Sequence, residues 1–194
     1  VRNKDFRIEK LHPVMSPRPG HADLAGLLKY GFSDIRNVLE RASARSTAAT
    51  VAIGAICKIF LREFHVQISS RVLSIGGESS PKAMEEQIRK AMRAQDTVGG
   101  IFEVTAQGVP TGFGSYAQPD RRLDARLGQS LMSIPGIKGF EVGLGFGYAH
   151  AFGSQVHDAI YYGKGKGYFR NSNNAGGIEG GISNGAPLVL RACM

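Results

Sequence analysis

Apolar residues recur at helical spacing from Ser33 to about Phe64, which is the clearest pattern in the chain. The positions that share one face are Ile35, Val38, Leu39, Ala42, Ala49, Ala52, Ile53, Ile56 and Phe60. This period predicts an amphipathic helix, with Ser33 as its N-cap and Asp34 in its first turn. Because small residues fill the middle of this segment, another helix or a ligand can approach its backbone closely.

Weaker patterns predict the remaining elements. Residues 66–75 alternate as a strand does, and Ser80–Pro81 is typical of the start of a helix, here expected over 81–95. Residues 1–22 contain three prolines and no clear period, so a loop is expected there. The other expected elements are strands at 97–110, 138–146 and 187–192, and a helix of about fourteen residues capped by Asp120. Helices and strands mix along the chain without a linker-like boundary.

Glycine is unusually frequent, at 26 of 194 residues, and it gathers in local doublets. The segment 173–185 (NNAGGIEGGISNG), here called the glycine string, contains two of these doublets. Such a composition suits neither an ordinary helix nor an ordinary strand, because glycine loses much backbone entropy there. It is typical of a segment that follows a special path or closely approaches a ligand.

The formal net charge of +8 favours an anionic partner. Lysine and arginine can neutralise nucleic-acid phosphates or line a pocket for a small anionic substrate. The charges are scattered and tryptophan is absent, which disfavours a nucleic-acid partner. No run approaches the ~20 apolar residues of a membrane span, and the two cysteines lack CxxC spacing. We therefore expect a cytoplasmic protein without a membrane partner.

The familiar cofactor and metal motifs are missing. Gly143, Gly145 and Gly147 give only part of a dinucleotide fingerprint, and no phosphate-binding GxxxxGK[ST] loop occurs. His150 and His157 have no carboxylate cluster nearby, so no metal site is expected.

His21 is the strongest candidate for proton transfer. It lies in the string RPGHADL (18–24), between Arg18 and Asp23, and histidine exchanges protons near neutral pH. A structural histidine is the alternative.

Arg41, Ser43 and Arg45 form a second candidate cluster. On an ideal helix the two arginines share a face and Ser43 points away. Either the backbone departs from a helix here or ligand groups wrap around its end. The alternative is a pair of solvated arginines and a serine inside a helix.

Six strings, in order, resemble chorismate synthase. They are PRPGHADLAGLLKYG (17–31), DIRNVLERASARST (34–47), DTVGGIFEVTAQGVPTGFGSY (96–116), RRLDARLGQSLMSIPGIKGFEVGLGF (121–146), GSQVHD (153–158) and the glycine string. The resemblance implies an α+β fold, a β-α-β sandwich with central helices between antiparallel sheets. It further implies one domain over 1–194 and a homotetramer.

The resemblance also implies a chemistry. Chorismate synthases are lyases of the shikimate pathway that serve aromatic amino acid biosynthesis. They convert 5-enolpyruvylshikimate 3-phosphate into chorismate and phosphate by 1,4-anti elimination. They require reduced FMN (FMNH2), and NADPH, where it is used, only reduces the flavin. Because substrate and FMN are both anionic, the positive net charge fits this expectation.

Family roles transfer to nine positions of this sequence. His21 matches a histidine that protonates the reduced flavin. The matches to substrate-binding residues are Arg18, Ser43 and Arg45. The matches to FMN-binding residues are Arg41, Ala42, Ser43, Pro135, Gly136 and Gly180.

The chain also departs from the family pattern. Ser46 stands where the family has glutamate. The family's N-terminal segment with its GESHG histidine, and its C-terminal segment beginning KPIPT, are absent from the sequence. The alternative hypothesis is therefore a non-catalytic or incomplete homologue that binds an anionic ligand.

Overall fold

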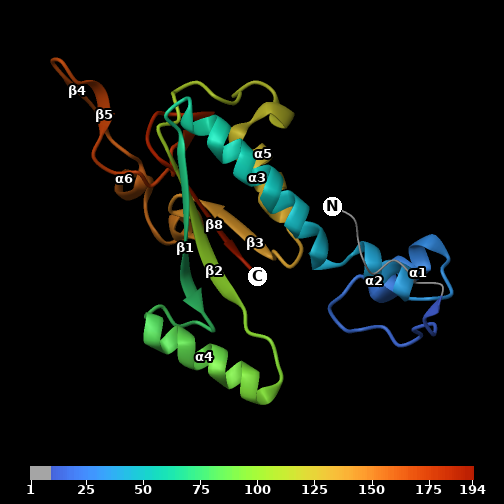
Figure 1. Cartoon of the computed structure of the whole chain (residues 1–194). Coiled ribbons are helices and arrows are strands. Elements are labelled where there is room, and N and C mark those ends of the chain that lie inside the picture. Colours follow the sequence, from blue (N-terminus) through green and yellow to red (C-terminus); the bar gives the residue numbers. More distant parts are fainter. Residues whose placement is uncertain (1–9) are drawn as a thin grey trace. The chain divides into compact units, whose positions relative to one another are not determined.

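The computed structural model describes residues 10–194 and comprises two compact units, residues 1–56 and 57–194 (Figure 1). Residues 1–9 of the predicted N-terminal loop lie outside the described residues. The prediction of a single domain over 1–194 stays a prediction.

The first unit is built from two short helices, α1 (Asp23–Tyr30) and α2 (Arg36–Arg41), followed by a 3-10 turn, η2 (Ala44–Ser46), and the start of α3 (Thr47–Arg62). Ile35 and Val38 are its buried apolar residues. Gly26 allows α1 to pack on α2, because a Cβ at this position would lie 2.6 Å from Val38 Cγ1. Helix α1 ends at Gly31, which adopts a left-handed conformation.

The predicted continuous helix from Ser33 to Phe64 is wrong in two respects. Ser33 is not its cap: Asp34 Oδ1 instead accepts hydrogen bonds from the backbone N–H groups of Val14 and Arg36, both at 2.9 Å. The helix is also interrupted between α2 and α3, where Ser43 is extended with φ −68° and ψ 135°. The segment is therefore two helices joined by a bend and a 3-10 turn.

The second unit is organised around a four-stranded antiparallel sheet of order β1-β2-β8-β3. The strands are β1 (Gln67–Ile75), β2 (Gly100–Gln107), β3 (Gly139–Val142) and β8 (Leu188–Cys193). Burial alternates along β8, so Leu188, Leu190 and Ala192 face the core. All four predicted strands are confirmed, with shorter limits for three of them.

Two helices accompany this sheet. The predicted helix α4 (Pro81–Ala94) is confirmed, and Ser80 Oγ caps it by accepting from Ala83 N at 3.3 Å. Helix α5 (Leu123–Met132) is shorter than predicted, and Asp120 lies in a separate 3-10 turn, η3 (Pro119–Arg121). Arg122, which is extended, precedes α5, so the prediction that Asp120 caps this helix is wrong.

Several short elements were not predicted from the sequence. Two are hairpins, β4 (Ile160–Gly163) with β5 (Gly167–Arg170), and β6 (Ile178–Glu179) with β7 (Ile182–Ser183). The others are the 3-10 helix η4 (Gly145–His150) and helix α6 (Gly153–Val156). The glycine string thus contains a small hairpin, against the expectation that its composition suits no strand.

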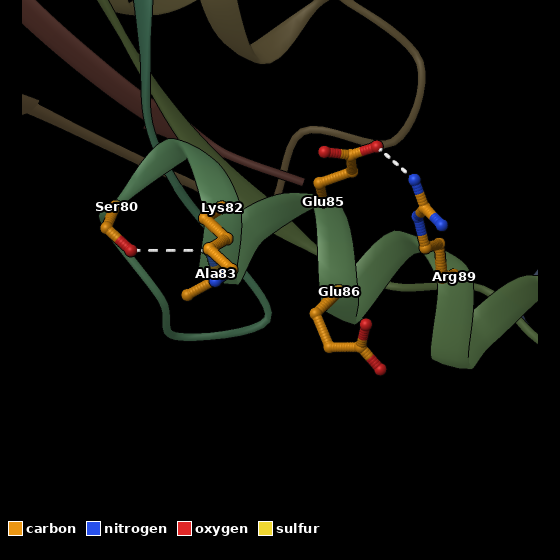
Figure 2. A pocket seen from close by; sticks show the side chains of 6 residues that line it. All are labelled: Ser80, Lys82, Ala83, Glu85, Glu86 and Arg89. Carbon is orange, nitrogen blue, oxygen red and sulfur yellow. Dashed lines mark hydrogen bonds and ion pairs between the residues drawn. The ribbon is translucent and has the colours of Figure 1, made fainter.

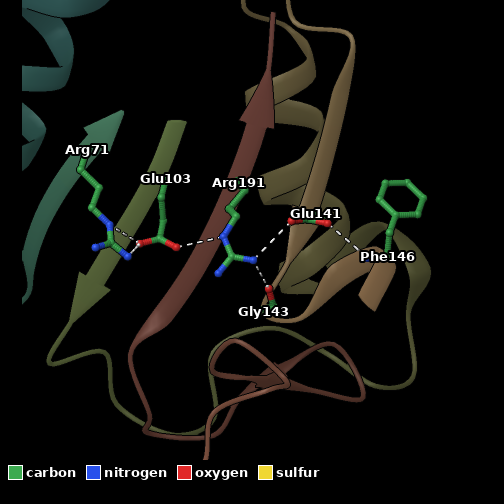
Figure 3. A network of polar contacts seen from close by, with 6 residues as sticks. All are labelled: Arg71, Glu103, Glu141, Gly143, Phe146 and Arg191. Carbon is green, nitrogen blue, oxygen red and sulfur yellow. Dashed lines mark hydrogen bonds and ion pairs between the residues drawn. The ribbon is translucent and has the colours of Figure 1, made fainter. Parts of the chain in front are cut away.

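Charged side chains form a row across one face of the sheet (Figure 3). Glu103 is only 5% exposed and accepts from Arg71 Nη2 at 2.7 Å and from Arg191 Nε at 3.0 Å. Burial raises the pKa of Glu103, but the hydrogen bonds from the two arginines outweigh it and leave that pKa below its ordinary value. Arg191 Nη1 continues the row to Glu141 Oε1 at 3.3 Å, so four adjacent strands are linked in register.

The stretch Arg36–Arg62 has the length and mean hydropathy, 1.4 in its most apolar window, of a membrane-crossing helix. Length and composition alone are weak evidence, because the core helix of a soluble protein passes the same test. Such a core helix is mostly buried, whereas none of this window is buried. The stretch is moreover broken at Ser43, and α3 by itself has 16 residues.

Candidate functional site

A tight loop presents Arg18 and His21 just before helix α1. The carboxylate of Asp23, the first residue of α1, is 1% exposed and binds Arg18 three times. It accepts from the Arg18 backbone N at 3.0 Å, from Nε at 2.9 Å and from Nη2 at 3.1 Å. The side-chain hydrogen bond from Arg18 lowers the pKa of Asp23 to about 2 and raises the pKa of Arg18.

The imidazole of His21 is oriented by its own loop. His21 Nδ1 lies 2.9 Å from the carbonyl oxygen of Pro19. Since a carbonyl can only accept, we assign the proton to Nδ1, which leaves Nε2 as the nitrogen available for a ligand. The side chain is exposed in a hollow of about 550 Å³, which Arg18, Leu24 and Leu28 also line. His21 is therefore placed to exchange a proton at Nε2.

The break between α2 and α3 settles how Arg41, Ser43 and Arg45 are arranged. Because the backbone leaves the helix at Ser43, the first of the two predicted arrangements is confirmed. Ser43 Oγ accepts from the backbone N and the Nε of Arg45, both at 3.3 Å. Arg45 Nη1 also pairs with Glu40 Oε2 at 3.1 Å. Ser43 and Arg45 thus form one polar cluster in the bend.

Arg41 and Ala42 line a different hollow, of about 670 Å³, between α1 and α2. Its walls are mostly apolar and include Ala22, Ala25, Gly26, Tyr30, Phe32 and Val38. An apolar hollow that an arginine also lines suits a flat aromatic ring that carries an anionic tail.

In the second unit, Pro135 and Gly136 follow the C-terminal end of α5. Gly136 has a φ of +91°, and a Cβ added there would come no closer than 3.6 Å to any atom, the nearest being the Met194 side chain. Glycine is thus required for the backbone conformation rather than by crowding within this chain.

Gly180 lies in the turn between β6 and β7 and has open space beside it. Its φ is +59°, and a Cβ there would meet no atom within 4 Å. The neighbouring Gly181 is crowded, because its Cβ would lie 2.7 Å from the carbonyl oxygen of Ser115. The turn is anchored to the start of α5, since Leu123 N donates to Gly181 O at 2.9 Å and Arg122 Nη1 to Gly180 O at 3.4 Å.

The predicted site residues fall into separate groups. The first unit holds Arg18, His21, Arg41, Ala42, Ser43 and Arg45, within a stretch of 28 residues. In the second unit, Gly180 lies at one end of α5 and Pro135–Gly136 at the other. A helix of ten residues is about 15 Å long, so these two contacts are not adjacent.

Asp158 supports the glycine string, a role that the sequence analysis missed. Its Oδ1 accepts from Ser172 Oγ at 2.5 Å and Asn174 N at 2.8 Å, and its Oδ2 from Ala175 N at 2.8 Å. Burial raises the pKa of Asp158, but hydrogen bonds from Ala175 and the other donors outweigh it and lower the pKa overall. Asp158 therefore fixes the start of the glycine string. The only signal in the sequence is its place in GSQVHD.

A further hollow, of about 530 Å³, lies along α4 (Figure 2). It is formed by side chains of the first turns of this helix and its cap, with Glu85 paired to Arg89 at 2.6 Å. None of the predicted site residues lines it. We assign it no part in the candidate site.

Comparisons with known proteins bear on the whole chain. The family model described as "Chorismate synthase" matches residues 1–194. The chorismate synthase of Caldanaerobacter subterraneus subsp. tengcongensis is 53% identical over 197 residues, which cover 100% of this chain and 56% of that protein. The chorismate synthase of Thermoanaerobacter pseudethanolicus is 51% identical with the same coverage. The chain thus spans little more than half the length of these relatives.

A solved structure titled "Crystal Structure of Chorismate Synthase" matches with a TM-score of 0.84 and 47% identity. The match covers 89% of this chain and 62% of the solved chain. It confirms the predicted fold class, α+β with helices and antiparallel sheets. The family model, the relatives and the solved structure agree: the chain belongs to the chorismate synthase family.

Proposed function

We propose that the protein catalyses the chorismate synthase reaction, the 1,4-anti elimination of phosphate from 5-enolpyruvylshikimate 3-phosphate. The observation that carries this proposal is the loop at 18–23, where Arg18, held by Asp23, and His21, oriented by Pro19 O, line one hollow. Family membership supplies the identity of the reaction.

The arginines are suited to the anionic substrate. Arg18 keeps its charge and is half exposed, so the N–H groups that Asp23 does not bind can bind a phosphate or carboxylate. Arg45, with Ser43 as a neutral hydrogen-bonding neighbour, supplies a second cation. Both guanidiniums are held in place by a carboxylate, which reduces the entropy lost when they bind an anion.

The residues present also fit reduced FMN. Within the first unit, the apolar hollow that Arg41 and Ala42 line has room for a flat ring. Within the second unit, the left-handed backbone and open side of Gly180 would let a ligand approach the backbone closely. By the resemblance, Ser43, Pro135 and Gly136 would also contact the flavin. When bound, reduced FMN supplies electron density transiently while phosphate leaves. NADPH enters the proposal only as a reductant of the flavin.

His21 supplies the proton chemistry of this site. With Nδ1–H bonded to Pro19 O, Nε2 carries a proton only when the imidazole is cationic. The cationic ring can then donate from Nε2, and the neutral ring can accept there.

Anaerobic turnover with dithionite-reduced FMN tests the proposal, by following the release of phosphate and chorismate. We expect product from the wild type and a turnover reduced about 100-fold or more in His21→Ala, because positioned acid–base groups contribute that much. FMN binding should change little in this variant. His12→Ala, an exposed histidine in the same unit, is the matched control and should turn over normally.

Two other results would count against the proposal. FMN binding without product from the wild type would favour the alternative, a non-catalytic homologue that binds an anionic ligand. Equal loss of turnover and FMN binding in His21→Ala would assign this residue a structural role.

We further propose that the protein works as a homotetramer in the cytoplasm, without nucleic-acid or membrane partners. The hairpin of β4 and β5 supports assembly, because Ile160, Tyr162 and Tyr168 are 60%, 70% and 78% exposed. Clustered apolar surface of this kind is typical of protein–protein contacts. The mass in solution, measured by light scattering after gel filtration, tests the oligomeric state.

A further inference from the structure

Asp23 is buried, whereas the other residues of the loop at 18–23 are exposed. Among the described residues only Asp23, Glu103 and Ser183 are buried polar or charged side chains, and Asp23 is 1% exposed. Its partner Arg18 has a side chain that is 52% exposed. The buried carboxylate of Asp23 thus binds one edge of the Arg18 guanidinium, and the rest of that side chain is exposed to solvent.

This ion pair determines which N–H groups of the Arg18 guanidinium can still bind a ligand. Asp23 occupies Nε and one N–H of Nη2, the lateral edge that carboxylates commonly bind. A guanidinium has five N–H donors, so both N–H groups of Nη1 and the second of Nη2 remain. These form the terminal edge, which can still bind two oxygens of an anion side by side.

The same carboxylate closes the loop. Asp23 Oδ2 accepts from the Arg18 backbone N as well as from its side chain. Between these residues, Gly20 has a φ of +73°, and Pro19 supplies the carbonyl that orients His21. One buried group therefore sets the conformation of the arginine and of the loop that carries the histidine.

We propose that Asp23 is a positioning residue that directs the terminal Nη1–Nη2 edge of Arg18 toward a phosphate or carboxylate of the ligand and holds the His21 loop in its binding shape. This inference rests on the proposed function, in which Arg18 binds substrate. It differs from a purely structural role for Asp23, in which loss of the carboxylate lowers stability without changing how Arg18 binds anions.

The test is a titration of the full chain with inorganic phosphate, followed by the ¹⁵N NMR signals of the arginine side chains. In the wild type we expect a slowly exchanging Arg18 Nε–H and a phosphate-dependent shift at Arg18. Asp23→Asn should speed that exchange and weaken phosphate binding at Arg18 about tenfold, because a hydrogen bond to a charged partner is lost. Asp23→Glu, which keeps the charge, should recover part of the affinity. Glu85→Gln, which breaks the exposed pair with Arg89, is the matched control and should change nothing.

A double variant separates positioning from stability. If Asp23 acts through Arg18, then Arg18→Ala with Asp23→Asn should bind phosphate no more weakly than Arg18→Ala alone. Additive losses would overturn the proposal, as would unchanged phosphate binding at Arg18 in Asp23→Asn. The exchange rate of Arg18 Nε–H in the wild type is decisive by itself. Rapid exchange would contradict the hydrogen bond from Nε to Asp23, even if Asp23→Asn fails to fold.

Turnover assays on the same variants distinguish this inference from the proposed function. If the wild type makes no chorismate but its phosphate binding at Arg18 depends on Asp23, the proposed function fails and the positioning role stands. If the wild type turns over and Asp23→Asn behaves like the wild type in KM and kcat, the positioning role fails and the proposed function stands.

Discussion

The loop at 18–23 and the glycine string at 173–185 both carry proposed ligand contacts, but different interactions hold them in shape. The loop depends on one buried carboxylate, Asp23, while its other residues are exposed. The glycine string depends on many backbone hydrogen bonds, and Gly176, Gly177 and Ile178 are buried within it. We therefore expect the loop to be sensitive to the loss of charge and the string to be sensitive to added atoms.

The difference follows from what each segment packs against. In the string, Asn184 N donates to Gly177 O, and Val189 N donates to Gly176 O. Ser183 Oγ accepts from Phe113 N at 2.9 Å and donates to Pro110 O at 2.6 Å. A Cβ added at Gly176 would lie 2.4 Å from Gly143 N, and one added at Gly177 would lie 2.6 Å from Pro187 O, so these two positions leave no space for a side chain. The loop at 18–23 is instead held by the ion pair between Arg18 and the buried Asp23.

Gly177→Ala should have the largest effect on stability. Gly177 has a φ of +80°, and a Cβ there would lie 2.6 Å from Pro187 O and 2.8 Å from Ala186 O. A left-handed alanine and a clash with backbone together should cost about 2–5 kcal/mol of unfolding free energy. Urea unfolding measures this loss, and a loss below 1 kcal/mol would show that the string can move aside.

Asp158→Asn should have the next largest effect, because it weakens the carboxylate that anchors the start of the glycine string. The amide keeps a single acceptor oxygen, whereas the carboxylate serves Ser172 and the backbone N–H groups of Asn174 and Ala175. We expect a loss of about 1–3 kcal/mol, measured by urea unfolding. Asp120→Asn, an exposed aspartate, is the control and should stay within about 0.5 kcal/mol of the wild type.

The same contrast explains what could be predicted from the sequence. Local signals were sufficient for α4, where Ser80, Pro81 and an amphipathic period all agree. They failed at the break between α2 and α3, because Ala42 and Ala49 are seven residues apart, which is close to two full helical turns. The apolar period therefore continues in phase across the break and does not reveal it.

For the candidate site, too, one part could be predicted from the sequence and another could not. The chemical types of its residues could be assigned from the sequence by resemblance, but the groups that hold them could not. Asp158 lies 14–17 residues before its partners, and two of those three partners are backbone N–H groups, which no residue type signals. Asp23 lies only five residues from Arg18, yet its burial depends on how the loop closes.

Low pH should lower the stability of the folded protein, because Asp23 in the loop at 18–23 becomes protonated. Its pKa is about 2 in the folded protein because Arg18 donates to it, against about 3.9 in an unfolded chain. A lowered folded pKa stabilises the protein above the unfolded value, and this contribution is lost as pH falls from about 4 to about 2. Urea midpoints measured across this range should fall less steeply in Asp23→Asn. Asp158, whose pKa is also lowered, acts in the same direction, so Asp158→Asn should remove a separate part of the slope.

Gly180→Ala should have the smallest effect on stability and yet affect the proposed ligand most. A Cβ at Gly180 meets nothing within 4 Å, so only its left-handed backbone, worth about 1–2 kcal/mol, opposes alanine. Gly165→Ala is the matched control, because Gly165 also has a positive φ and open space but lies in the turn between β4 and β5. Both variants should lose similar stability, while FMN affinity, measured by flavin fluorescence, should fall only in Gly180→Ala. Equal FMN affinity in the two variants would mean that the open side of Gly180 does not face the flavin.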